Sequence, residues 1–66
     1  MYYLKCKRMD RDTSYYIWAN QKNLNEWCIS ITPSYFQDYK TAHMLYELVS
    51  NKRGILSELK ILNTKK

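Results

Sequence analysis

The chain begins with the stretch Tyr2-Tyr3-Leu4-Lys5-Cys6-Lys7-Arg8, and the stretch Ser14-Tyr15-Tyr16-Ile17-Trp18-Ala19 follows after a short charged segment. Neighbouring side chains of a β-strand point to opposite faces of the sheet, so this alternation predicts two strands, over 2–8 and 14–19. The segment Met-Asp-Arg-Asp-Thr at 9–13 favours a turn, since aspartates bond nearby backbone amides. The two strands should form a hairpin with large aromatics on both faces.

A third strand is predicted over 27–31, where Trp27, Ile29 and Ile31 alternate with smaller residues. The segment 20–26 is rich in asparagine and reads as a polar loop, although Leu24 can cover an edge of the core. Pro33 ends the third strand because it has no amide to donate to a ladder.

The period changes to that of a helix after Asp38, with Ala42, Leu45, Tyr46 and Val49 on one stripe. Asp38 suits the N-cap position, because a carboxylate accepts bonds from the first free amides of a helix. At the other end, the run Lys-Arg-Gly at 52–54 closes the helix. We therefore predict a helix over about 39–51, with Phe36 tucked under its first turn.

The last apolar run, 55–62, fits two periods. Apolar residues at 55, 59 and 62 suit a helix, whereas 55, 57, 59 and 61 alternate with Glu58 and Lys60 as in a strand. We prefer the strand, because it gives a thin sheet a fourth member beside the first strand. Residues 63–66 read as a flexible polar tail.

The resulting order is β-β-β-α-β: a small single α+β domain over 1–66, with one helix packed on a mainly antiparallel four-stranded sheet. We expect the side of Ile17 to be the core side of the second strand. The predicted core residues are Tyr2, Leu4, Ile17, Trp27, Ile29, Ile31, Leu45, Val49, Leu59 and Ile61. The opposite face should carry Tyr3, Lys5, Lys7, Tyr16, Trp18, Cys28, Ser30, Glu58 and Lys60.

Composition limits the class of protein. The chain has 66 residues, is 45% hydrophobic and 15% aromatic, and carries a net charge of +5. This composition is typical of a globular protein rather than a disordered one, but a chain of this size has a thin core and marginal stability. The positive charge favours acidic partners such as nucleic acid or an anionic protein surface.

The two cysteines are expected on opposite faces, Cys6 with Leu4 and Cys28 with Ser30, so they should remain reduced thiols. No secretory apolar segment follows Met1, and no apolar run approaches the length of a membrane span. We therefore expect a cytoplasmic protein with no membrane association.

The sequence carries no recognisable catalytic or metal motif. His43 is the only histidine and has Glu47 four residues on, a spacing that predicts a surface contact between them. One glycine cannot form a phosphate-cradling loop, and two distant cysteines with one histidine do not form a zinc site. We expect no enzymatic activity, no cofactor and no metal.

The face opposite the helix is the candidate partner-binding site, formed by Tyr3, Lys5, Lys7, Tyr16, Trp18 and Lys60. Tyrosine and tryptophan are frequent in protein interfaces, so a protein partner is the first interpretation. The same rings and lysines also suit single-stranded nucleic acid, in which bases stack on aromatics. Self-association as a homodimer through this face is the third interpretation.

The composition, rich in Lys, Tyr, Asn and Ile with a single Gly and a single Pro, is typical of AT-rich bacterial and phage genomes. In general character the chain resembles small phage proteins that bind a larger host protein and block it. The resemblance implies a phage-encoded inhibitor of a host protein, for example a defence or replication factor that is blocked in the host cytoplasm. The alternative is a nucleic-acid-binding module that uses the same face.

Overall fold

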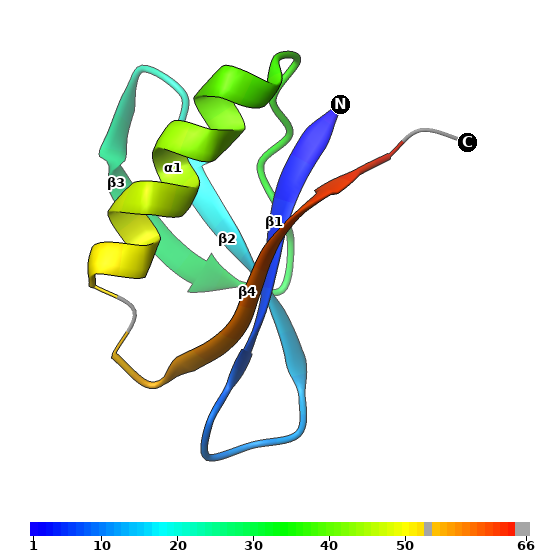
Figure 1. Cartoon of the computed structure of the whole chain (residues 1–66), viewed down its shortest axis with the longest axis vertical. Coiled ribbons are helices and arrows are strands. Elements are labelled where there is room, and N and C mark those ends of the chain that lie inside the picture. The colour runs from blue at the N-terminus through cyan, green and yellow to red at the C-terminus, as the bar shows by residue number, and fades with distance from the viewer. Residues whose placement is uncertain (53, 65–66) are drawn as a thin grey trace.

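The computed structural model describes residues 1–52 and 54–64 and shows a small α+β domain (Figure 1). Its elements, in chain order, are β1 (Tyr2–Arg8), β2 (Ser14–Asn20), β3 (Asn23–Ser30), α1 (Tyr39–Asn51) and β4 (Leu56–Asn63). The predicted fold class is confirmed, including the assignment of the last apolar run to a strand. Arg53, part of the predicted helix end, lies outside the described residues, as do 65–66 of the predicted tail.

The four strands form one antiparallel sheet in the order β3-β2-β1-β4, so β4 lies beside β1 as predicted. Figure 1 shows α1 packed across one face of this sheet, while the β1–β2 turn projects away from it. The helix begins after Asp38, whose carboxylate accepts bonds from the Thr41 hydroxyl at 2.8 Å and the Thr41 amide at 3.4 Å. These bonds from Thr41 lower the pKa of Asp38, as expected for a capping carboxylate.

The core lies between α1 and one face of the sheet. β1 and β2 contribute alternate residues, α1 contributes one stripe, and Phe36, which precedes the helix, is buried in the same cluster. The buried apolar residues are Leu4, Cys6, Ile17, Ala19, Phe36, Ala42, Leu45, Val49, Leu56 and Leu59. Tyr2, Leu24, Trp27 and Ile61 are partly buried against this cluster. The side of β2 that carries Ile17 is thus the core side.

Two predicted core residues are not in the core. Ile31 is 81% exposed and Ile29 is 38% exposed. The strand ends at Ser30, so Ile31 leaves the pleat that would have turned it toward the helix. Ile29 pairs with the fully buried Ile17, but β3 is an edge strand and no further strand shields its outer side.

The predicted loop at 20–26 is also shorter than expected. Asn20 pairs with Asn23 and Ala19 pairs with Trp27, so the turn is Gln21-Lys22 and residues 24–26 bulge out of the ladder. The asparagines that suggested a loop instead stabilise this turn: the Asn20 side chain accepts a bond from the Lys22 amide at 2.9 Å. Asparagine favours such side-chain to backbone bonds, which is why a hairpin turn resembled a loop.

The segment 34–36 fills a gap between β1 and β2. The pairing of these strands extends only from Lys7 to Lys5 on β1; beyond it, Tyr2 exchanges two backbone bonds with Phe36, at 2.7 and 2.8 Å. On the other side, the buried Ser34 hydroxyl bonds both the amide and the carbonyl of Ala19 at 2.9 Å. Ser34 therefore satisfies two backbone groups that the missing ladder would leave unpaired.

A bulge in β4 reconciles the two periods of its sequence. Lys5 pairs with Lys60 and Lys7 with Ser57, so Cys6 alone lies opposite two residues, Glu58 and Leu59. Glu58 has a φ of 51° in the left-handed region. The extra residue resets the alternation, so that Leu56 and Leu59 are both buried although they are three residues apart. This is why the run also fitted a helical period.

The end of β4 extends into the predicted tail. Asn63 is the last residue of the strand and pairs with Tyr2, and the amide of Thr64 donates to the carbonyl of Met1 at 2.8 Å. Asn63 thus belongs to the sheet and Thr64 is bonded to its edge, contrary to the prediction that a flexible tail begins at 63. Long-range pairing with the first residues of the chain holds them.

Replacing Ser34 with alanine tests the junction between β1 and β2. The variant leaves the buried amide and carbonyl of Ala19 without their partner, which costs about 1–3 kcal/mol in the free energy of unfolding. Urea denaturation followed by circular dichroism measures the loss. Ser30→Ala is the matched control, because the Ser30 hydroxyl bonds only exposed groups. Equal free energies of unfolding for Ser34→Ala and Ser30→Ala would contradict the stabilising role of the Ser34 bonds at this junction.

Substitutions of Glu58 test the bulge. The left-handed conformation costs a residue with a Cβ about 1–2 kcal/mol and costs glycine almost nothing. Glu58→Gly is therefore expected to be at least as stable as the parent chain, and Glu58→Val to be less stable, since a β-branched residue suits this region least. Both variants lose the same exposed contact with Lys7, so the difference between their unfolding midpoints isolates the backbone effect. Indistinguishable midpoints would mean that the bulge is absent in solution.

Candidate functional site: the open sheet face

The face of the sheet opposite α1 brings together all six predicted site residues. Residues directly opposite in an antiparallel ladder point to the same side, and the observed register fixes the members of that side. We call this side the open face; it comprises Tyr3, Lys5, Lys7, Ser14, Tyr16, Trp18, Cys28, Ser30, Ser57, Lys60 and Leu62. The helix of the described chain packs on the other side, so no helix covers these residues.

Three tyrosines form a row across the open face. The ring centroids of Tyr16 and Tyr3 are 5.8 Å apart, and those of Tyr3 and Tyr35 are 5.6 Å apart in an edge-on arrangement. Sequence reasoning missed Tyr35, which reaches the face because 34–36 lies beside β1. The signal was present: if Phe36 and Ser34 face the core of an extended segment, the residue between them faces outward.

Trp18 is the most exposed large ring on the strands of this face, with 44% of its surface accessible. It stands opposite Cys28, and no described residue makes a ring contact with it. Cys28 is exposed, whereas Cys6 on the core side is 1% exposed and burial raises the pKa of its thiol. Both thiols are free, as predicted from their opposite faces.

The lysines gather at the other end of the open face, around a hollow of about 250 Å³. We call it the lysine hollow; its lining residues are Lys5, Cys6, Lys7, Ser14, Glu58 and Lys60. Lys7 lies 3.5 Å from Asp12 and 3.8 Å from Glu58. Lys5 and Lys60 are directly opposite each other, and no carboxylate of residues 1–52 or 54–64 forms an ion pair with either.

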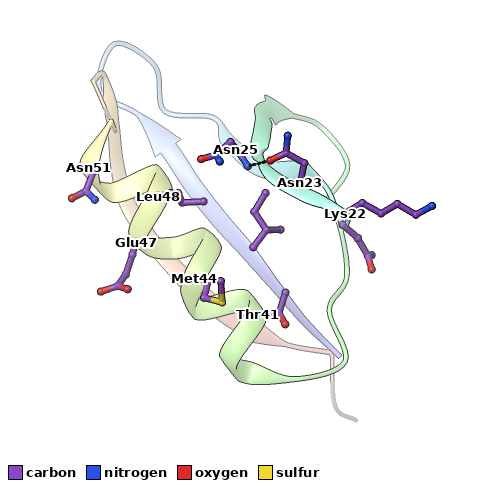
Figure 2. Close-up of a pocket in the computed structure, with 10 residues that line it drawn as sticks. Lys22, Asn23, Asn25, Thr41, Met44, Glu47, Leu48 and Asn51 are labelled. Carbon is purple, nitrogen blue, oxygen red and sulfur yellow. Dashed lines mark hydrogen bonds between the residues drawn. The ribbon is translucent and has the colours of Figure 1, made fainter.

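A larger hollow of about 690 Å³ lies on another side of the molecule, between α1 and the start of β3 (Figure 2). Leu24, Met44 and Leu48 supply its apolar lining, and amide side chains such as those of Asn23 and Asn25 surround them. The amide of Asn25 bonds the Asn23 side chain at 3.2 Å. Lys22 and Glu47 are the charged residues of its lining.

Aromatic rings also follow one side of α1. His43 lies between Tyr39 and Tyr46, with centroid distances of 5.9 and 6.1 Å. Its Nδ1 is 3.9 Å from a carboxylate oxygen of Glu47, which confirms the predicted surface contact. Tyr39 in turn meets Tyr2 edge-on at 5.5 Å, so this row covers one margin of the core.

Within the described ranges, no three of the residues His, Cys, Asp and Glu cluster closely enough to hold a metal ion. In the same part of the chain, no helix has the length and apolar character needed to cross a membrane. Comparisons with protein-family models, with curated proteins and with solved structures find no significant match to this chain. The functional argument therefore rests on the chain's own residues.

Proposed function

We propose that this chain is a small non-enzymatic binding protein that docks its open face on another protein. The observation that supports the proposal best is Trp18, a large ring left accessible beside the tyrosine row on the face that the helix does not cover. Tryptophan and tyrosine dominate interface hot spots, because they bury a large area with little loss of side-chain entropy. A four-stranded sheet that holds them also presents them rigidly.

The arrangement of the open face favours a protein over a nucleic acid. Nucleic-acid platforms place cations along a track beside rings that are free to stack on successive bases. Here the lysines lie together at one end, and Tyr3 is engaged edge-on by Tyr35, which leaves Trp18 as the ring without a neighbour. One aromatic anchor beside a compact cationic end is typical of a protein interface with a polar rim.

We extend the proposal to the class of partner. The chain is phage-encoded and blocks a host protein, such as a defence or replication factor, by occupying its surface in the host cytoplasm. Support comes from the amino-acid composition, which is typical of AT-rich bacterial and phage genomes. The net charge of +5 also supports it, because positive charge steers the chain toward acidic surfaces. Occupying a surface requires shape and charge alone, and a domain of this size supplies both.

Substitution of Trp18 tests the docking face. The tagged full-length chain captures its partner from a bacterial lysate, and the partner is identified and purified for a binding measurement. Trp18→Ala is expected to weaken that binding by more than about tenfold, because it removes the central anchor. Met44→Ala is the matched control: Met44 is 50% exposed but lies on α1, away from the open face. Cys28, opposite Trp18, should also be protected from alkylation in the complex.

Three outcomes would contradict the proposal. Recovery of no protein partner is the first, and unchanged affinity of Trp18→Ala is the second. The third is tight binding of a short oligothymidylate whose affinity falls steeply with salt, which would establish the nucleic-acid alternative. Light scattering on the free protein addresses the homodimer, since a dimer that Trp18→Ala dissociates would assign the face to self-association.

A further inference from the structure

The lysine hollow holds a charge arrangement that the chain itself does not balance. Lys5 and Lys60 are paired across β1 and β4 and project from the same face. Like charges directly opposite in an antiparallel pair destabilise a sheet. Three lysines and one glutamate line the hollow, and Asp12 pairs with Lys7 from beside it, so three positive charges meet two negative ones.

We propose that the lysine hollow is an anion-binding site, and that its ligand is a carboxylate side chain on an acidic surface of the protein partner. The inference rests on the proposed docking of the open face and names the chemistry of the surface that the face recognises. An anion between Lys5 and Lys60 converts their repulsion into two attractions. The exposed Ser14 hydroxyl, at the same hollow, is a further donor.

Glu58 shows that a carboxylate fits this hollow. Its side chain belongs to the lining, and one of its oxygens lies 3.8 Å from the Lys7 ammonium. Asp12 approaches the same ammonium at 3.5 Å, so Lys7 is compensated from two sides. Lys5 and Lys60 are therefore the two ammonium groups of the hollow that can bind an anion from another molecule.

The size and position of the hollow favour a single acidic side chain over a polyanion. A volume of about 250 Å³ equals that of roughly eight waters at the roughly 30 Å³ that each occupies in the liquid, which is room for one carboxylate group with its hydration shell and not for a chain of charged groups. The described open face has lysines only at this end, and Tyr16, Tyr3 and Trp18 follow. A nucleic-acid backbone would need further cations along that direction, whereas an acidic residue followed by apolar residues on a protein surface matches it.

The experiment uses the full-length, isotopically labelled protein and a hexaglutamate peptide as the probe. Nuclear magnetic resonance titration at low salt is expected to shift the amides of Lys5, Ser14 and Lys60 in a saturable manner. The double variant Lys5→Gln/Lys60→Gln is expected to bind the peptide at least about tenfold more weakly. The control Lys22→Gln/Lys40→Gln removes the same charge from residues outside the hollow and should bind within about twofold of the parent.

Two further measurements keep the inference falsifiable. Glu58→Gln removes the internal carboxylate and is expected to tighten peptide binding several-fold, so weaker binding contradicts the site. The Lys5→Gln/Lys60→Gln variant loses a repulsion and should melt no lower than the parent at low salt, which separates loss of binding from loss of folding.

The competing ligand is a short oligothymidylate in the same titration. If it binds through Lys5 and Lys60 more tightly than hexaglutamate, the carboxylate assignment is overturned in favour of phosphate. Equal effects of the two double variants would show that only net charge attracts the peptide, and would overturn the site. Peptide binding at the hollow together with unchanged partner affinity of Trp18→Ala would retain the anion site and reject the proposed docking face.

Discussion

A sheet has two faces, and one helix can cover only one of them. In this chain α1 takes the face that carries Leu4 and Ile17, so every residue one position away in β1 and β2 must face the other side. A polar exposed face would have been the usual solution. Here Tyr16 and Trp18 occupy it instead, and the alternation that builds the core is the same one that presents them. A slip of the register by one residue would therefore exchange the core side and the open face together.

The bulge in β4 affects both faces of the sheet. By adding one residue opposite Cys6, it returns Leu56 and Leu59 to the core side. The residue that adopts the left-handed conformation to achieve this is Glu58, whose carboxylate then stands at the lysine hollow. Bulges commonly redirect a side chain at an edge, and they also make an edge strand less receptive to foreign strands. One local distortion therefore serves packing, charge placement and protection of the edge.

Local patterns were enough to predict β1 and the helix with its Asp38 cap, because alternation, helical period and capping depend on near neighbours. For β4 the local pattern fitted two periods, and the preference for a strand came from the need of the sheet for a fourth member. Local patterns failed where contacts between segments decide the structure. Ile31 continued an apolar alternation after its strand had ended, and 20–26 contained loop-forming residues that the pairing of β2 with β3 holds in a hairpin. Local alternation turns Tyr35 away from the core side of Ser34 and Phe36, but only the long-range bonds of 34–36 to β1 and β2 place this segment beside the candidate site.

The thin core and the unbalanced lysines act on the same quantity, the stability of the free chain. A domain of about 60 residues retains only a small free energy of unfolding, so a repulsion of a few tenths of a kcal/mol between Lys5 and Lys60 is a measurable share of it. A partner that binds only the folded chain raises its stability by mass action, and a partner carboxylate between the lysines removes the repulsion as well. In the proposed complex, the repulsion between Lys5 and Lys60 would thus be replaced by attraction to the carboxylate. A surface arranged in this way gains more from an acidic partner than a neutral face of the same area would gain, because binding also relieves a strain that folding alone leaves in place.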